Sequence, residues 1–240
     1  MLVNRKLVAT REKAQAYLMA GSVTVNGRRE TKAGTKFDVD SEIIIAEDPI
    51  PYVSRGGLKL EAAIDCWEIG LDGRVCIDIG ASTGGFTDLM LQRGAKKVYA
   101  IDVGYGQLDY KLRNDPRVVN MEKTNVRLLD TDAFPEKADF ITIDVSFISL
   151  KLVLPVAERL LAAGDSAIVC LVKPQFEAER AQVGKGGIVR DAAVHEAVIL
   201  NVKGYASESG LETVSVTDSP ITGTKGNKEF LFLLKRGPVL

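Results

Sequence analysis

Apolar segments alternate with amphipathic segments from residue 58 onward, and this alternation limits the fold more than any other feature of the chain. Apolar strands separated by helices are typical of a parallel sheet that is covered on both faces. The predicted strands are VCIDIG (75–80), KVYAIDV (97–103), RVVNM (117–121), FITIDVSF (140–147), SAIVCLVKP (166–174), LETVSVTD (211–218) and EFLFLLKRG (229–237). The predicted helices cover residues 58–67, 85–94, 150–162 and 191–210. The sequence therefore predicts an α/β domain whose ligands bind outside the carboxyl ends of its strands.

The first part of the chain has a different charge pattern. Residues 1–36 hold eight lysines and arginines against two glutamates, whereas residues 37–50 hold five acids and no base. Because the net charge of the whole chain is −1, any nucleic-acid binding has to come from a local patch of this kind. The N-terminal residues are therefore a candidate nucleic-acid-binding unit.

This unit is predicted to be a small α+β domain. Thr10 is a candidate N-cap for a helix in REKAQAYLM, which Gly21 ends. VTVNGRRE is a strand that enters an Asn-Gly turn, and EIIIA is a further strand. The prolines and glycines of EDPIPYVSRGG indicate a linker. The predicted boundaries are residues 1–48 for the basic unit, 49–57 for the linker and 58–240 for the α/β domain.

Composition excludes several other classes of protein. Cys66, Cys76 and Cys170 lie in apolar stretches without C-x-x-C spacing, which indicates buried, reduced thiols and neither a disulfide framework nor a zinc site. No apolar run is long enough to span a bilayer, and the start MLVNRKLVAT lacks the apolar core of a signal peptide. We expect a cytoplasmic protein that binds no membrane and no metal.

The stretch DIGASTGGFTD places glycines between a predicted strand and a predicted helix, an arrangement that presents backbone N–H groups to a ligand. It also matches the G-x-S-x-G motif of serine hydrolases, and Ser82, Asp144 and His195 occur in the hydrolase order. However, His195 is the only histidine and lies inside a predicted helix, so a hydrolase is not favoured. A dinucleotide fingerprint would require glycine in place of Ser82.

A second nucleotide-binding feature is present. Asp102 ends the next predicted strand about twenty residues later, where a carboxylate binds ribose hydroxyls. A site with this carboxylate and an altered pyrophosphate loop suits S-adenosylmethionine, with Asp78 at the amino group, glycine backbone along the methionine part and Asn125 beside adenine. The candidate cofactor-binding residues are Asp78, Gly80, Ser82, Thr83, Gly84, Gly85, Phe86, Asp102, Asn125 and Asp144.

Four ionisable residues lie where predicted strands and helices begin or end. Lys59 lies in the opening turn of the first helix of the α/β domain, Asp144 and Lys173 end consecutive strands, and Glu229 opens the last strand. An isolated lysine or glutamate is usually a solvated charge. Two of these residues at the ends of consecutive core strands, beside a cofactor loop, indicate a candidate catalytic set.

The N-terminal stretch ATREKAQAYLMAGSVTVNGRRETKAGTKF resembles the S-four type RNA-binding domain. The resemblance implies that the helix face and the turn after it contact RNA phosphates. Members of that family usually begin about a helical turn earlier, so we expect the N-terminus to be clipped. The candidate RNA-binding residues here are Arg11, Lys13, Arg28, Arg29 and Lys32.

The chain as a whole resembles the TlyA family of FtsJ-like ribose 2′-O-methyltransferases. The resemblance rests on SRGGLKL, DIGASTGGFTD, AIDVGYGQL, EKTNVR, DVSFISL, LVKPQFE, GKGGIVRD and GNKEF, and on Lys59, Asp144, Lys173 and Glu229 as the family's lysine–aspartate–lysine–glutamate tetrad. It implies a Rossmann-like S-adenosylmethionine methyltransferase sheet behind a small α+β RNA-binding domain.

The resemblance also implies an activity, namely methylation of ribosomal RNA, free or in ribosomal subunits, at a cytidine 2′-oxygen. Lys173 would be the general base, and Asp144 and Glu229 would orient the lysines and the hydroxyl. Lys185 and Arg190 of the glycine-rich VGKGGIVRD would face RNA. Two alternatives remain: a non-enzymatic RNA-binding factor, and a cytolysin, since some family members carry a historical haemolysin label.

Overall fold

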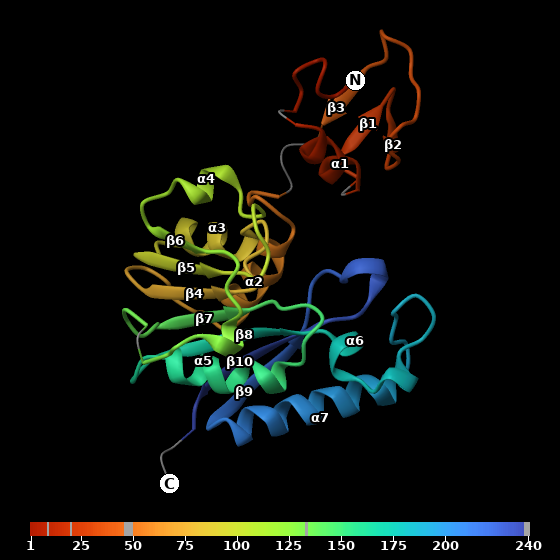
Figure 1. Cartoon of the computed structure of the whole chain (residues 1–240). Helices are drawn as coiled ribbons and strands as arrows, with labels where there is room; N and C mark the ends of the chain where they lie inside the picture. The colour runs from red at the N-terminus through yellow and green to blue at the C-terminus, as the bar shows by residue number, and fades with distance from the viewer. Residues whose placement is uncertain (9, 20, 46–49, 133, 238–240) are drawn as a thin grey trace. The chain divides into compact units, whose positions relative to one another are not determined.

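A computed structural model describes all residues except 9, 20, 46–49, 133 and 238–240. The chain forms two compact units, Met1–Pro51 and Tyr52–Leu240, and each is described by itself (Figure 1). Residues 46–48 of the predicted basic unit and residue 49 of the predicted linker lie outside the described residues.

The first unit is a short helix packed on a small antiparallel sheet. Its elements are α1 (Arg11–Met19), β1 (Val23–Val25), β2 (Arg28–Glu30) and β3 (Ile43–Ile45), with the strand order β2-β1-β3. Thr10 Oγ1 accepts the backbone N–H of Lys13 at 3.1 Å and so caps the helix as predicted. The β1–β2 turn is made by Asn26 and Gly27, which both have positive φ.

The second unit is built on a mostly parallel sheet. Its strands are β4 (Val75–Ile79), β5 (Lys97–Ile101), β6 (Val118–Met121), β7 (Phe140–Ile143), β8 (Ala167–Val172), β9 (Leu211–Asp218) and β10 (Phe230–Arg236). The strand order is β6-β5-β4-β7-β8-β10-β9, and β10 runs antiparallel to both of its neighbours. The predicted α/β fold is confirmed.

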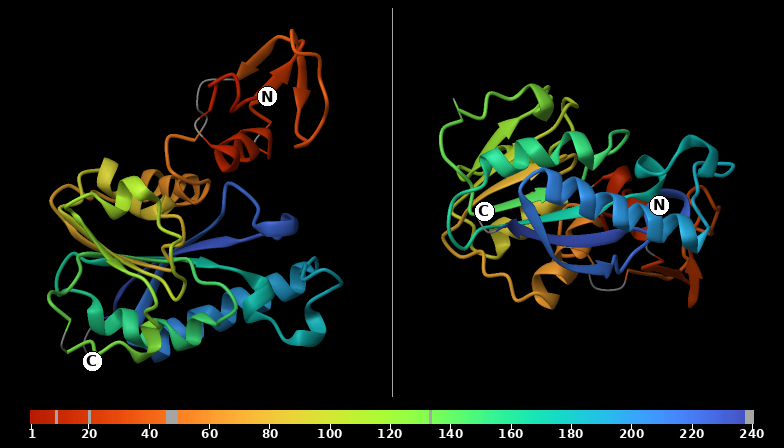
Figure 2. Two further views of the ribbon diagram at one scale, coloured as in Figure 1. Left: turned by 45° about the horizontal axis from the view of Figure 1, so that its top comes forward. Right: turned by 90° about the horizontal axis from the view of Figure 1, so that it is seen from below.

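Helices cover both faces of this sheet, with α2 and α3 on one face and α5 and α7 on the other (Figures 1 and 2). The α-helices are α2 (Gly56–Cys66), α3 (Gly85–Gln92), α4 (Tyr110–Arg113), α5 (Leu154–Leu160), α6 (Pro174–Glu177) and α7 (Ala192–Glu208). The 3₁₀ helices are η1 (Val126–Leu128), η2 (Leu150–Leu152), η3 (Arg180–Gln182) and η4 (Thr224–Gly226). Because both faces are covered, β4, β7 and β8 are buried at every position.

Two local predictions were wrong. The helix predicted over residues 150–162 is divided into η2 and α5. Pro155 lacks an N–H, and in a continuous helix its ring would clash with the carbonyl one turn earlier. Cys66 is exposed because it is the last residue of α2, whereas Cys76 and Cys170 are buried free thiols within strands.

The topology gathers several chain segments at one edge of the sheet. From β4 the chain continues to β5 and β6 on one side of β4, and it then returns to place β7 on the other side. The strand order therefore reverses between β4 and β7. Ligands of α/β sheets bind at such a reversal, outside the carboxyl ends of the strands. Since Phe230 pairs with Val172, the start of antiparallel β10 lies at the end of β8 and reaches the same edge.

Gly80 follows β4 at this edge and is required there for two reasons. Its φ is +89°, and a Cβ would overlap the backbone carbonyl of Asp144.

We expect Gly80→Ala to lower the free energy of unfolding by about 2–4 kcal/mol, because the overlap adds to the backbone strain. Gly106 is the control, since its φ is +69° but nothing lies within 4 Å of an added Cβ. Gly106→Ala should cost only about 1 kcal/mol. Equal losses for the two variants in urea unfolding would contradict the close approach at Gly80.

Candidate active site

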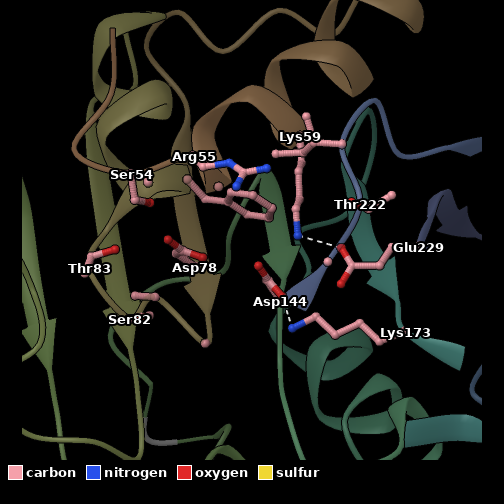
Figure 3. A pocket seen from close by; sticks show the side chains of 17 residues that line it. Ser54, Arg55, Lys59, Asp78, Ser82, Thr83, Asp144, Lys173, Thr222 and Glu229 are labelled. Atoms are coloured by element: carbon pink, nitrogen blue, oxygen red, sulfur yellow. Dashed lines mark hydrogen bonds and ion pairs between the residues drawn. The ribbon is translucent and has the colours of Figure 1, made fainter. Parts of the chain in front are cut away.

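A cleft of about 310 Å³ opens at the carboxyl edge beside the strand-order reversal (Figure 3). It brings together the end of β4, the start of α2, the residues after β7 and β8, and the residue before β10. Its lining residues are Ser54, Arg55, Gly56, Lys59, Asp78, Gly80, Ala81, Ser82, Thr83, Gly85, Phe86, Asp144, Lys173, Ile221, Thr222, Gly223 and Glu229. All four members of the predicted catalytic set are among them.

The four ionisable residues form two lysine–acid pairs. Lys59 Nζ lies 2.5 Å from Glu229 Oε2, and Lys173 Nζ lies 2.5 Å from Asp144 Oδ1. The side chain of Glu229 is 2% exposed and that of Lys59 is 11% exposed, so this pair is almost withdrawn from water. In Figure 3 the Lys59 side chain runs down from helix α2, and the Lys173 side chain enters from the lower right, from the end of β8.

The loop before β10 fixes the position of Glu229. A Cβ on Gly223 would overlap the Glu229 carboxylate, so a larger residue there would displace that side chain. Asn227 is 2% exposed; its side chain accepts the Val189 N–H at 3.1 Å and donates to the Gly187 carbonyl at 2.9 Å. These bonds join the segment that leads into β10 to the glycine-rich loop.

That glycine-rich loop also carries Lys185 and Arg190, which were predicted to face RNA. Both side chains are exposed, and neither lines the cleft. Lys225 Nζ donates to the Gly186 carbonyl at 3.0 Å, which adds a third bond between the two loops.

Asp102 holds the backbone of the predicted cofactor loop. Its Oδ2 accepts the Ser82 N–H at 2.8 Å, and its Oδ1 accepts the Gly104 N–H at 2.7 Å. Ser82 has φ +49°, a conformation that L-residues rarely adopt and that this bond stabilises. The carboxylate predicted to bind ribose therefore also shapes the loop, although Asp102 itself does not line the cleft.

Two other predicted cofactor residues lie outside the cleft lining. Gly84 has φ +96°, and a Cβ there would overlap the side chain of Leu112, so this glycine meets a packing requirement. Asn125 lies beyond β6, where its side-chain oxygen accepts the Arg127 N–H at 3.2 Å and caps η1.

Asp78 is completely buried at the floor of the cleft. It accepts hydroxyl hydrogen bonds from Thr87 at 2.7 Å and Thr142 at 3.0 Å. Burial raises the pKa of Asp78 to about 6, and the two hydroxyl bonds only partly oppose the loss of hydration. A buried carboxylate with this raised pKa indicates a site that would gain from a cationic ligand.

The residues required by a serine hydrolase do not come together. The His195 ring lies 3.2 Å from the Val189 carbonyl oxygen and contacts the Phe230 ring edge-on, and it does not line the cleft. Ser82 Oγ instead donates to Gln107 at 3.3 Å. This geometry agrees with the rejection of the hydrolase from sequence.

The cleft fits S-adenosylmethionine by the chemistry of its polar groups. The cofactor carries a sulfonium and an ammonium, and Asp78 and Asp144 present carboxylates on the loop side of the cleft. A pyrophosphate would instead be repelled by these two acids. Gly80 and Gly85 leave backbone at the surface of the cleft, where no side chain blocks the ligand.

Several lining residues were missed by the sequence analysis. Ser54 and Arg55 were assigned to the linker, but the adjoining Val53 N–H donates to Asp88 at 2.9 Å, which fixes this segment against α3. Ile221 and Thr222 come from an irregular loop without any periodic pattern. The sequence signal for Ser54 and Arg55 as site residues was their place in SRGGLKL, where they form a polar pair directly before a helix.

The predicted RNA-binding residues of the first unit all lie at its surface. Arg11, Lys13, Arg28, Arg29 and Lys32 are exposed. Arg29 also has a structural contact, because its Nε donates to the Gly21 carbonyl at 2.8 Å. This bond holds the backbone that leaves α1.

Comparison with known proteins gives matches along nearly the whole chain. The FtsJ-like methyltransferase model matches residues 52–236, and the S4 domain model matches residues 1–43. "16S/23S rRNA (cytidine-2'-O)-methyltransferase TlyA" of Mycobacterium tuberculosis is 43% identical over 98% of this chain and 87% of its own length. Hemolysin A of Brachyspira hyodysenteriae is 44% identical over 92% of each chain.

A solved structure extends these matches to the fold. A candidate hemolysin from Streptococcus thermophilus superposes with a TM-score of 0.80 at 46% identity, covering 99% of this chain and 87% of that one. The fold, the cleft and the family models define an FtsJ-like, S-adenosylmethionine-dependent methyltransferase with an N-terminal S4 domain. Within that class the chain belongs to the TlyA family, and the predicted resemblance is confirmed.

Two further properties of the part of the chain that the structure describes concern membranes and metal ions. No helix in this part of the chain has the length and apolar character needed to cross a membrane. In the same residues no three His, Cys, Asp or Glu side chains gather closely enough to hold a metal ion.

The raised pKa of Asp78 makes stability depend on pH. The folded protein binds the Asp78 proton more tightly than the unfolded chain, so its contribution is present below about pH 3.8 and lost as pH rises through about 6. At pH 7.5 the charged carboxylate should cost about 3 kcal/mol. Asp78→Asn, which keeps an acceptor for the threonines, should therefore gain stability relative to wild type between pH 4 and pH 7 in urea unfolding. A difference that stays constant over this range would contradict the assignment.

Proposed function

We propose that this protein transfers a methyl group from S-adenosylmethionine to a ribose 2′-hydroxyl of ribosomal RNA, at a cytidine. The observation that carries the proposal is the pair of lysine–acid contacts, Lys173 with Asp144 and Lys59 with Glu229, in one cleft beside the glycine loop. The relative from Mycobacterium tuberculosis, which is named as an rRNA (cytidine-2'-O)-methyltransferase, supports the proposal.

The reaction needs a base, because a ribose hydroxyl is a weak nucleophile. S-adenosylmethionine supplies an electrophilic methyl group on a sulfonium. Lys173, in its neutral form, would accept the hydroxyl proton on Nζ while the 2′-oxygen forms its bond to the methyl carbon and the methyl–sulfur bond breaks, leaving its electrons on sulfur. The ammonium that results is stabilised by the Asp144 carboxylate 2.5 Å away.

Lys59 and Glu229 have a supporting role in this proposal. Their side chains are nearly buried, so the two charges are shielded from solvent and hold each other in a fixed geometry. The Lys59 ammonium lies beside the cleft and favours negative charge that develops on the 2′-oxygen. Glu229 in turn holds Lys59 in that orientation.

The loop side of the cleft would hold the cofactor. Asp78 lies where a cationic amino group would relieve its burial, and the backbone of Gly80, Ser82, Thr83 and Gly85 allows close approach, with Phe86 completing the wall. Asp102 is proposed to bind ribose with the acceptor capacity that remains after its two backbone bonds. Gly84 and Asn125 would support this part of the site from outside the cleft lining.

The S4 domain supplies a docking surface for folded RNA. Its exposed cations, Arg11, Lys13, Arg28, Arg29 and Lys32, suit phosphate contacts that depend on RNA shape more than on base sequence. Lys185 and Arg190 are proposed as further phosphate contacts beside the cleft. We expect ribosomal RNA, free or within subunits, to be the partner.

The two alternatives predict different results. A non-enzymatic RNA-binding factor would not depend on Lys59 or Lys173. A cytolysin would release dye from liposomes. The two lysine–acid pairs and the cleft favour the enzyme, because nothing in RNA binding alone requires a nearly buried lysine beside a cofactor loop.

The base assignment is tested with Lys173→Ala. Methyl transfer to ribosomal subunits should fall by about 10³-fold or more, because general-base catalysis contributes about 10²–10⁴-fold. The affinity for S-adenosylmethionine should stay within about twofold, since the glycine loop is unchanged. Transfer is measured as radiolabel in alkali-resistant 2′-O-methyl dinucleotides.

Lys203, an exposed lysine of α7, provides the matched control. Lys203→Ala should transfer methyl groups at the wild-type rate. A Lys173→Ala enzyme that is equally active would refute the assignment of the base.

The docking surface is tested with Arg28→Glu. Affinity for ribosomal RNA should fall about tenfold, and the slope of log affinity against log salt should decrease by about one or two, because a phosphate contact is lost and a charge is reversed. Lys203→Glu makes the same change of charge on α7. Equal losses for both variants would show a general effect of net charge, not a docking surface on the S4 domain.

A further inference from the structure

Lys173 has a second fixed partner besides Asp144. Its Nζ donates to Ser146 Oγ at 3.0 Å, while the Asp144 carboxylate lies 2.5 Å away. Both partners come from the loop that follows β7, whereas Lys173 itself follows the neighbouring strand β8. The Lys173 amine is therefore held by one short segment, the residues that directly follow β7.

This arrangement determines which way the amine faces. An amine nitrogen has three tetrahedral directions besides its bond to carbon, and in the neutral form two carry hydrogens and one carries the lone pair. The Ser146 hydroxyl accepts one of these hydrogens and the Asp144 carboxylate lies against a second side of the nitrogen, so the lone pair takes the direction that neither partner occupies. A lysine with one partner could still rotate about its Cε–Nζ bond and present a hydrogen to the substrate.

We infer that Ser146 is a positioning residue for the general base and turns the lone pair of Lys173 toward the ribose hydroxyl. The inference rests on the proposed function and adds a residue to it. During transfer the 2′-hydroxyl proton moves to this lone pair and the electrons of the O–H bond stay on the oxygen. The oxygen forms its bond to the methyl carbon as the methyl–sulfur bond breaks, and the electrons of that bond stay on sulfur. Lys173 is then an ammonium that keeps its contacts with Asp144 and Ser146.

The loop that carries Ser146 is fixed at both ends. At its start the Asp144 N–H donates to the Ile79 carbonyl at 2.9 Å. At its end Glu177 accepts the Ser149 hydroxyl at 2.6 Å and the Leu150 N–H at 2.8 Å. An anchored loop of this kind holds the Ser146 hydroxyl at a defined place beside the lysine.

The residue after Ser146 has an unusual backbone. Phe147 has φ +63°, which is rare for a bulky side chain, and its ring is 91% exposed while it contacts the ring of Phe176 at 5.1 Å. Backbone strain of this kind persists only where the surrounding contacts impose it, and it is found mainly at functional sites. Here the strained turn lies directly beside the residue that touches the base.

An uncharged acceptor suits this role better than a second acid. A further carboxylate would favour the ammonium form of the lysine and so oppose the neutral base. A hydroxyl directs the amine at a much smaller electrostatic cost. This argument explains why a serine, and not an aspartate or glutamate, is suited to the position beside Lys173.

The test is Ser146→Ala with Ser146→Thr beside it. For Ser146→Ala we expect kcat to fall about tenfold or more, because a misdirected base loses part of the gain from orientation. The KM for RNA and the dissociation constant for S-adenosylmethionine should change less than twofold, since Ser146 bonds Lys173 and is not among the residues that line the cleft. Ser146→Thr keeps the hydroxyl and should restore kcat to within threefold of wild type.

Ser149→Ala is the matched control. It removes a hydroxyl from the same loop, but that hydroxyl bonds Glu177 and not Lys173. Glu177 still accepts the Leu150 N–H in this variant, so its kcat should fall clearly less than that of Ser146→Ala. A general loosening of the loop is thereby distinguished from loss of the contact with the base. Thermal melting of all three variants checks that they fold.

Four outcomes overturn the inference. The first is a wild-type kcat in Ser146→Ala, and the second is an equal loss of kcat in the alanine and threonine variants. Neither result touches the proposed function, which depends on methyl transfer by the wild-type protein and on its loss in Lys173→Ala. A kcat loss in Ser149→Ala as large as in Ser146→Ala would assign the effect to the loop. A wild-type protein that binds S-adenosylmethionine but methylates no ribosomal RNA would overturn the proposed function itself, and this inference with it.

Discussion

The antiparallel pairing of β10 with β8 is the constraint on which the candidate active site depends. It places Phe230 opposite Val172, so the residue before one strand and the residue after the other lie at the same edge. Glu229 and Lys173 are far apart in sequence and are brought to one cleft by this register alone. A shift of one residue would turn the neighbouring side chains to the other face of the sheet.

Charge at this edge is arranged at some cost to stability. Lys59 and Glu229 lie out of solvent, and a buried ion pair usually gains less from attraction than its ions lose in hydration. Asp78 is buried with only hydroxyl partners. Ser82 and Phe147 have positive φ at the same edge. The large apolar sheet below, with strands buried at every position, offsets these costs.

The sequence predicted well those features that follow from strand ends. Asp144, Lys173 and Glu229 were found because an ionisable residue directly after or before an apolar run is visible in one chain, and parallel strands share an edge. Features that depend on tertiary contacts were not visible. The second bond of Asp102, to Gly104, and the contact of Ser146 with Lys173 join residues whose spacing carries no periodic signal.

Glycines illustrate the same limit. The loop DIGASTGGFTD suggested that its three glycines all approach a ligand, yet each meets a different neighbour. Gly80 passes close to the Asp144 backbone, Gly84 packs against Leu112, and Gly85 lies against Ser54 in the segment before α2. A sequence motif identifies where backbone must come close to something, but the partner of each glycine is decided by elements elsewhere in the chain.

The place of β10 in the sheet also has a consequence for biosynthesis. This strand is inserted between β8 and β9, although it follows both of them in the chain. Until Glu229 and β10 are made, Lys59 lacks its acid and the sheet is split between β8 and β9. A nascent or prematurely terminated chain that ends before Glu229 would thus carry the glycine loop and three of the four ionisable residues, yet have an incomplete cleft. Competence for catalysis would arise only when β10 enters the sheet, and shorter products would not compete for RNA modification.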